Sequence, residues 1–275
     1  RGPQELSGII KFMAADEEVF RIPALAIVSQ VSKIKSTSLQ VHSTSALDAA
    51  GSAVDLKLSN GSQQAGSALI FNALGLDERK PGQAPNNPLK NASCDLQAAG
   101  YRIIEGKLQI AVKLYEALST WNLCEISVLI DTDGDGTAEQ EVIGVPVSRL
   151  EGLPPVKDFA TILLDATKAR EIRRKYEAEL KPDDPERKPV NYLPALLGAD
   201  EMVVHDLSTV AIIQVDVASL RLRPSGELSL KLATSAVDDL NVEMDDHLGE
   251  GWKKLDLSAK AQSFVNIPAE VSAPG

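Results

Sequence analysis

One short segment of the sequence carries residue types whose spacing fits the binding of a hard divalent cation. In Asp131-Thr132-Asp133-Gly134-Asp135-Gly136-Thr137-Ala138-Glu139, carboxylates stand at the first, third, fifth and ninth positions. Ca²⁺ takes about six to eight oxygen ligands, and carboxylates at alternate positions converge when the chain wraps around one centre. Gly136 permits the sharp turn, Thr137 offers its carbonyl oxygen, and Glu139 closes the shell. We therefore predict a Ca²⁺ site, with Mg²⁺ as the second choice, formed by Asp131, Asp133, Asp135, Thr137 and Glu139.

The flanking residues argue against the helical form of such a loop. An EF-hand carries a bidentate Glu at position twelve, where this sequence has Val142. The flanks, residues 124–130 and 140–147, have the apolar pattern of strands. An ordinary solvated Asp/Gly turn between two strands is the alternative. Three aspartates within five residues repel one another without a cation, which favours the metal site.

Further segments with alternating apolar residues predict the strands that would position this hairpin. Alternation places one face of each strand inward, and the runs lie at residues 54–58, 108–114, 126–130, 210–217, 228–232 and 264–267. Only residues 165–180 have apolar positions at helical spacing, followed by several prolines that end the helix. An α/β fold would need a helix between most strands. We therefore predict a mainly β fold, an antiparallel β-sandwich domain or domains with one inserted amphipathic helix.

Composition excludes several partner classes and leaves the cysteines open. The chain of 275 residues has 39 acidic and 28 basic residues and a formal net charge of −11, so we expect no nucleic acid partner. No stretch reaches the roughly 18 uncharged apolar residues of a membrane helix, so we expect no membrane span. Cys94 and Cys124 lack the spacing of a zinc site. They form either a disulfide, as an extracellular chain favours, or two buried thiols.

Residues for catalysis are scarce. The three histidines, His42, His205 and His247, stand in no recognisable catalytic or metal-binding motif, and we interpret them as surface residues. Adjacent acids such as Asp245-Asp246 are interpreted as solvated or as a secondary cation site, because neighbouring side chains of an extended chain point to opposite faces and do not act together on a glycoside. No nucleophile elbow, zinc-protease pair, phosphate-binding loop or dinucleotide-binding turn occurs. We therefore predict that this chain is not an enzyme.

Aromatic residues offer an alternative function. Stacking of sugars on aromatic rings is the usual basis of carbohydrate recognition, although aromatic residues make up only 4% of the chain and the core competes for them. The candidates for such a platform are Trp121, Trp252, Tyr101, Tyr115 and Tyr192.

A family resemblance joins the N-terminal strands to the acidic hairpin. Residues 6–12 (Leu-Ser-Gly-Ile-Ile-Lys-Phe), residues 20–28 (Phe-Arg-Ile-Pro-Ala-Leu-Ala-Ile-Val) and the hairpin at 125–147 together resemble C-terminal accessory regions of secreted bacterial subtilisin-like serine proteases. The resemblance implies the end of a fibronectin-like domain at residues 7–28 and β-sandwich repeats after it. The catalytic motifs of the protease are absent from the 275 residues. The start at Arg1 leads us to expect that a further N-terminal part precedes this chain.

Together these observations predict three parts and a function. Residues 1–35 are expected to be terminal strands of a preceding fibronectin-like domain or an N-terminal extension, residues 36–157 a β-sandwich with the calcium hairpin, and residues 158–275 a second β-rich region with the helix. The predicted function is a non-catalytic, calcium-stabilised accessory or interaction module of a secreted or cell-surface bacterial protein. Its expected partners are an upstream protease domain, a protein substrate or a cell-surface glycan. A carbohydrate-binding or adhesion module is the alternative.

Overall fold

The structure is a computed structural model that divides the chain into two compact units. Unit 1 comprises Arg1–Ile70 with Phe264–Gly275, and unit 2 comprises Phe71–Ser263. The structure describes residues 4–14, 17–28, 34–42, 53–61, 66–69, 71–79, 94–118, 120–147, 159–179, 190–204, 208–222, 227–236, 246–257 and 265–267.

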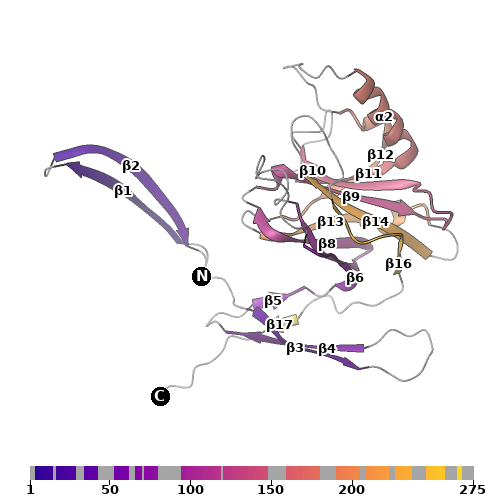
Figure 1. The fold of residues 1–275 in the computed structure, drawn as a ribbon, viewed down its shortest axis with the longest axis horizontal. Coiled ribbons are helices and arrows are strands. Elements are labelled where there is room, and N and C mark those ends of the chain that lie inside the picture. The colour runs from indigo at the N-terminus through magenta and orange to yellow at the C-terminus, as the bar shows by residue number, and fades with distance from the viewer. Residues whose placement is uncertain are drawn as a thin grey trace. The chain divides into compact units, whose positions relative to one another are not determined.

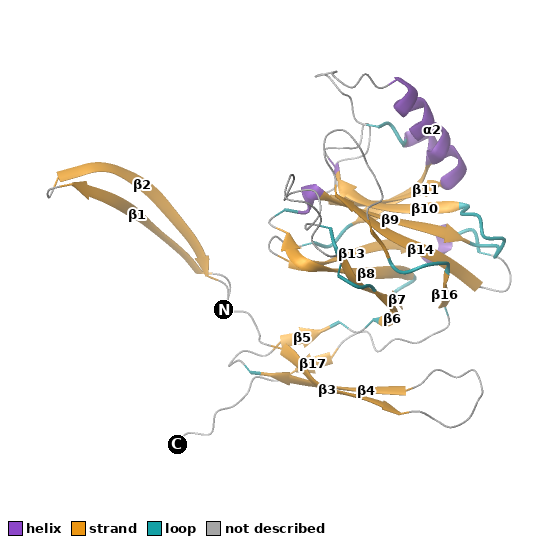
Figure 2. Cartoon of the chain, viewed as in Figure 1, coloured by secondary structure: helices purple, strands orange, loops and turns teal. Residues whose placement is uncertain are grey.

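Unit 2 is an antiparallel β-sandwich of two sheets (Figure 1, Figure 2). The smaller sheet has the order β13-β8-β7-β6, formed by Ser208–Asp216, Lys107–Leu118, Leu96–Ile104 and Asn72–Leu76. The larger sheet has the order β12-β11-β10-β9-β14-β15, formed by Leu196–Glu201, Phe159–Asp165, Gln140–Pro146, Cys124–Asp131, Glu227–Ala236 and Asp246–His247. Its seventh strand, β16 (Lys253–Asp256), also pairs with β14.

The main core lies between the two sheets. In β8 every second residue from Leu108 to Leu114 is buried, and the residues between them are more exposed, as alternation predicts. Together with β9 residues such as Val128, these side chains form one apolar cluster. Gly144 of β10 lies at a close approach of the two sheets, because a Cβ atom there would be 2.7 Å from Cγ2 of Ile213.

A second, smaller core lies on the outer face of the larger sheet. Strand β10 is buried along its whole length, since it has the sandwich core on one side and helix α2 (Ala166–Glu179) on the other (Figure 1). Ile143, Ile162 and Ala169 belong to this second cluster. Three 3₁₀ turns complete the described helical segments: η1 (Trp121–Leu123), η3 (Leu193–Ala195) and η4 (Val217–Ser219).

Pairing in the larger sheet connects strands from both sides of residue 157. Strand β10 precedes that position and β11 follows it, and the two pair from Gln140↔Asp165 to Pro146↔Phe159. The two sheets also meet at one edge, where Val203 and Ile212 form a β-bridge. Unit 2 thus contains strands from the second and third predicted parts of the chain.

The described residues of unit 1 form three antiparallel strand pairs. Strand β1 (Gln4–Ala14) pairs with β2 (Glu17–Val28), β3 (Ile34–His42) with β4 (Ala53–Asn60), and β5 (Gly66–Ala68) with β17 (Val265–Ile267). The predicted boundary between residues 35 and 36 falls within β3.

The predicted fold class is confirmed: a mainly β, antiparallel sandwich with one described α-helix. The helix was predicted at residues 165–180, and α2 covers Ala166–Glu179, with residue 180 outside the described part. Asp165 ends β11 and caps the helix, its Oδ1 accepting the N–H of Lys168 at 3.2 Å. No described helix is long and apolar enough to cross a membrane.

Candidate metal centre

The acidic loop joins two central strands of the larger sheet. Asp131 is the last residue of β9, and Gln140, the first residue of β10, pairs with Ile130. The N–H of Glu139 donates to the carbonyl of Ile130 at 3.0 Å, which closes the loop at its base. The pairing of β9 with β10 therefore places Asp131 and Glu139 next to each other at the base of the loop. Asp133 and Asp135 lie on the chain between them.

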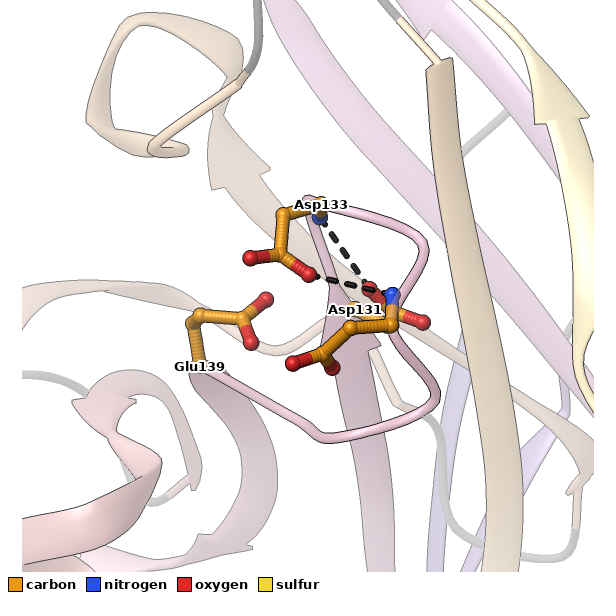
Figure 3. A group of neighbouring side chains, drawn as sticks. Asp131, Asp133 and Glu139 are labelled. Atoms are coloured by element: carbon orange, nitrogen blue, oxygen red, sulfur yellow. Dashed lines mark hydrogen bonds between the residues drawn. The ribbon is translucent and has the colours of Figure 1, made fainter.

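Four carboxylates converge in this loop. Asp131, Asp133, Asp135 and Glu139 each offer one oxygen, and these oxygens all lie within 4.8 Å of one another. Figure 3 shows the carboxylates of Asp131, Asp133 and Glu139 facing the inside of the loop. Asp131 is buried, Asp133 and Glu139 are half-buried, and Asp135 is exposed. The sequence prediction that these residues come together agrees with this arrangement.

Asp131 organises the loop backbone. Its Oδ1 accepts the N–H groups of Asp133 at 3.1 Å and Gly134 at 2.5 Å, and its Oδ2 accepts the N–H of Gly136 at 2.9 Å. Gly134 and Gly136 have φ angles of 76° and 86°, in the left-handed region that favours glycine. The Asp-Gly-Asp-Gly order therefore lets the backbone wrap around one carboxylate.

The side of the loop near β10 is held by Glu139. Its Oε2 accepts both the N–H of Thr132, at 2.7 Å, and the hydroxyl of Thr132, at 3.0 Å. Thr132 was not identified from the sequence as a residue that supports the loop. A hydroxyl next to the first aspartate was the available signal for its hydrogen bond to Glu139. Thr137, predicted to offer its carbonyl, is exposed and donates its N–H to Oδ1 of Asp135 at 2.7 Å. Its part in metal binding stays a prediction.

Surrounding elements fix the loop on the sandwich. The carbonyl of Glu139 accepts the N–H of Ala166, the first residue of α2, at 3.0 Å. The buried side chain of Gln140 donates to the carbonyl of Ser219 at 3.1 Å and accepts the N–H of Arg221 at 2.8 Å. The loop base is thus tied to the helix and to the segment after β13.

The electrostatics of the loop fit a cation. Four carboxylates so close together repel one another in their charged forms, and a divalent ion between them removes that repulsion. A carboxylate has about four lone-pair sites, so Oδ2 of Asp131 and the other acids retain acceptor capacity beyond their bonds to the backbone. Oxygen-only donors suit hard cations such as Ca²⁺ and Mg²⁺. The loop is therefore a candidate centre for a hard metal ion.

The histidine candidates are placed in different parts of the chain. His42 lies in β3 with its side chain outside the described residues, and His205 lies outside them altogether. His247 is exposed in β15, and its backbone N–H donates to Oδ1 of Asp246 at 3.1 Å. The interpretation of Asp246 as solvated was wrong. It is only 3% exposed, and Oδ2 accepts the N–H of Leu96 across the sandwich at 2.6 Å.

The aromatic candidates do not form an open platform within the described residues. Trp121 and Tyr101 are buried in the sandwich core. Each of the other three has a cation over its ring: Arg79 over Tyr115 at 5.6 Å, Arg173 over Tyr192 at 5.8 Å, and Lys231 over Trp252 at 4.9 Å.

The two cysteines form a disulfide between the sheets. Cys94 lies two residues before β7 of the smaller sheet, Cys124 begins β9 of the larger sheet, and their Cα atoms are 5.7 Å apart. The hydroxyl of Thr234 adds a second link by donating to the carbonyl of Cys94 at 2.7 Å. Of the two sequence alternatives, the disulfide is the one observed.

Fold and loop together define a mainly β protein with an inter-sheet disulfide and a candidate metal centre. Comparisons of the chain with protein-family models, with curated proteins and with solved structures find no match. Inferences about function therefore depend on the geometry of the loop and its supports.

Proposed function

We propose that this chain is a non-catalytic, calcium-stabilised accessory or interaction module of a secreted protein. The observation that carries the proposal is the convergence of Asp131, Asp133, Asp135 and Glu139, whose carboxylate oxygens lie within 4.8 Å of one another. Such a donor set matches the preference of Ca²⁺ for several carboxylate and carbonyl oxygens.

Calcium is favoured over magnesium by the number and kind of donors. Ca²⁺ accepts about six to eight oxygens in flexible geometry, whereas Mg²⁺ demands near-ideal octahedral geometry and usually keeps several waters with only one or two carboxylates. A loop with four convergent carboxylates supplies more protein ligands than a typical Mg²⁺ site uses. The carbonyl of Thr137 would add a fifth protein ligand.

The proposed role of the ion is structural. Both strands of the hairpin contribute to the sandwich core, and the loop base is bonded to α2 through Ala166 and Glu139. An ion that binds the folded loop alone stabilises the folded state by mass action, by about 2.7 kcal/mol when its concentration is a hundred times the Kd. Neutralising the loop carboxylates would therefore strengthen the whole unit.

Secretion and an accessory role have separate support. The disulfide between Cys94 and Cys124 is typical of proteins that fold in oxidising compartments. The sequence resemblance to C-terminal regions of secreted subtilisin-like proteases supports an accessory role beside an upstream protease domain. The proposed partner is the upstream protease domain, a protein substrate or a cell-surface glycan.

Isothermal titration of metal-free protein with CaCl₂ and, separately, with MgCl₂ tests the site. We expect one Ca²⁺ per chain, weaker binding of Mg²⁺, and a rise in Tm on adding Ca²⁺. Asp133→Ala should abolish the heat of Ca²⁺ binding, while Glu171→Ala, at an exposed acid of α2, should leave it unchanged. Absence of binding at millimolar Ca²⁺ by the folded wild-type protein would contradict the proposal.

A further inference from the structure

The outer edge of the larger sheet is interrupted close to the acidic loop. Strands β15 and β16 both pair antiparallel with β14, and residues 248–252 stand out from the ladder between them. At the start of this edge turn (residues 248–252), the N–H of Leu248 donates to the carbonyl of Leu232 in β14 at 3.0 Å. Extra residues in a strand disrupt the ladder, and such bulges often redirect a side chain toward a site. The residue that ends the edge turn is Trp252.

The edge turn is anchored on both sides. Leu248 at its start and Leu255 of β16 beyond its end are both buried in the sandwich core. Between these anchors, Gly249 and Gly251 have φ angles of 59° and 79°, which let the chain reverse direction there. Core packing on both sides therefore sets the direction in which Trp252 leaves the backbone.

Trp252 reaches from the sheet edge across β14 to the acidic loop. The ammonium group of Lys231, in β14, lies over its ring, 4.9 Å from the centroid. On the other side of β14 lies β9, from which the loop continues. A Cβ atom at Gly136 of the loop would be 3.9 Å from Nε1 of Trp252. The half-buried indole therefore lies against two elements besides its own, β14 and the loop.

The charges around the indole favour this orientation. An aromatic ring is negative on its faces and positive at its edge, so a cation over a face and anions near the edge both attract it. Trp252 has Lys231 over a face, and its Nε1 lies at the loop whose four carboxylates come within 4.8 Å of one another. The indole N–H is a donor only, which suits a loop rich in acceptors.

We propose that Trp252 positions the metal loop, so that ion binding and the packing of the edge turn stabilise each other. This inference rests on the proposed calcium site. Trp252 lies against Gly136, whose N–H donates to Oδ2 of Asp131 at 2.9 Å and which directly follows the carboxylate of Asp135. Holding Gly136 in place therefore holds both carboxylates near each other. Coupling between two sites is reciprocal in free energy, so the bound ion in turn holds Trp252 and the edge of the sheet.

Calorimetric Ca²⁺ titration of folded variants tests the positioning role. Trp252→Ala should weaken Ca²⁺ binding by about tenfold, as the loss of a group that orients metal ligands commonly does. Tyr115→Ala is the matched control and should leave the Kd unchanged, because Tyr115 is another half-buried ring with a cation over it, Arg79, but lies in the smaller sheet. A residue that merely stabilised the fold would lower the Tm in chelator without changing the Kd of the folded protein. Circular dichroism verifies that each variant is folded.

Tryptophan fluorescence tests the same coupling without an alanine variant. The chain has two tryptophans, and the other one, Trp121, is fully buried just before β9, at the end of that strand away from the loop. Ca²⁺ should shift the emission of the wild type and shield Trp252 from quenching by acrylamide. Trp121→Phe should retain this response, and Trp252→Phe should lose it.

The outcomes distinguish a failure of the coupling from a failure of the calcium site. Heat of Ca²⁺ binding in the wild type with an unchanged Kd in Trp252→Ala, or a fluorescence response that survives Trp252→Phe, would overturn the coupling and leave the calcium site intact. No heat of binding in the wild type would overturn both.

Discussion

At the scale of single residues, Asp131 and Asp135 have different tasks in the same loop. The carboxylate of Asp131 is buried and accepts three backbone N–H groups, whereas Asp135 is exposed and accepts the N–H of Thr137. A hydrogen bond to a charged group contributes about 1.5–3 kcal/mol to stability, and donors left buried without a partner cost more. Asp131 therefore holds the loop in shape, and Asp135 mainly adds a ligand.

Two alanine substitutions separate these tasks. Asp131→Ala should lower the free energy of unfolding by about 2–3 kcal/mol even in the presence of chelator, because the loop N–H groups lose their acceptor. Asp135→Ala should change that value by less than about 0.5 kcal/mol in chelator but weaken Ca²⁺ binding. Urea unfolding in chelator and calorimetric titration measure the two effects. Equal loss of stability in both variants would contradict the division of tasks.

At the scale of elements, one ion pair fixes α2 on the sheet. Arg173 of α2 forms an ion pair with Glu141 of β10, whose side chain is only 2% exposed, and the hydroxyl of Ser127 donates to Glu141 at 3.0 Å. Nε of Arg173 also donates to the hydroxyl of Tyr192 at 3.1 Å. Burial alone would lower the pKa of Arg173, but the charge of Glu141 outweighs burial and raises it.

Removing the arginine should therefore loosen the helix. Arg173→Met leaves the Glu141 carboxylate buried without its cation, which should cost about 3–5 kcal/mol of unfolding free energy. Arg174→Met, at the neighbouring exposed position of the same helix, should cost less than about 0.5 kcal/mol. Thermal and urea unfolding provide the values. Adding Glu141→Gln to Arg173→Met removes the buried charge and should recover part of the lost unfolding free energy. No recovery would mean that the uncompensated charge of Glu141 is not the cause of the loss.

The start of the same helix gives the protein an acid-sensitive contact. Burial alone would raise the pKa of Asp165, but the N–H of Lys168 and the guanidinium of Arg221 outweigh it, so the pKa lies below its ordinary value of 3.8. A pKa that is lower in the folded than in the unfolded state stabilises the fold above the unfolded value. That contribution is lost as the pH falls through the folded value.

Asp165→Asn isolates this contribution, since asparagine also caps helices but carries no charge. The difference in unfolding free energy between wild type and variant should be constant from neutral pH down to about pH 5, and shrink as the pH falls below 3.8. Glu171→Gln, at an exposed position of α2, should show no such trend. A difference that grows in acid would reverse the sign of the argument.

Sequence patterns were sufficient for elements that depend on local information. Alternation located strands such as β8, β9 and β14 but not β11, which is buried on both faces and does not alternate; helical spacing located α2, and the Asp/Gly spacing located the loop. Each successful prediction reflects a periodicity or turn chemistry within a few residues. Glu141 and Asp246 were not recognised, since each is satisfied by a group far away in sequence, Arg173 and Leu96. The disulfide remained one of two alternatives for the same reason. Long-range pairing is information that one periodic segment does not contain.

At the scale of the whole of unit 2, β9 is fixed at both of its ends. Cys124, its first residue, is bonded to Cys94, which lies just before β7, and Asp131, its last residue, begins the acidic loop. The bonds Leu96 to Asp246 and Thr234 to Cys94 also connect the sheets at the disulfide end. At about 3.3 Å per residue, the two ends of β9 are roughly 23 Å apart.

Because the two ends are so far apart, the disulfide and the metal ion should stabilise unit 2 independently. A disulfide that closes a separation of 30 residues contributes about 3–4 kcal/mol through the entropy of the unfolded chain, and Ca²⁺ at a hundredfold excess over Kd contributes about 2.7 kcal/mol. Effects of sites more than about 10 Å apart usually add within about 0.5 kcal/mol. Urea unfolding of wild type and of Cys94→Ala/Cys124→Ala, each with Ca²⁺ and with chelator, forms the cycle that measures the coupling. A coupling free energy well above about 0.5 kcal/mol would mean that the disulfide and the metal ion affect each other's contribution to stability. The ion would then act on the packing of the sheets as well as on its own loop.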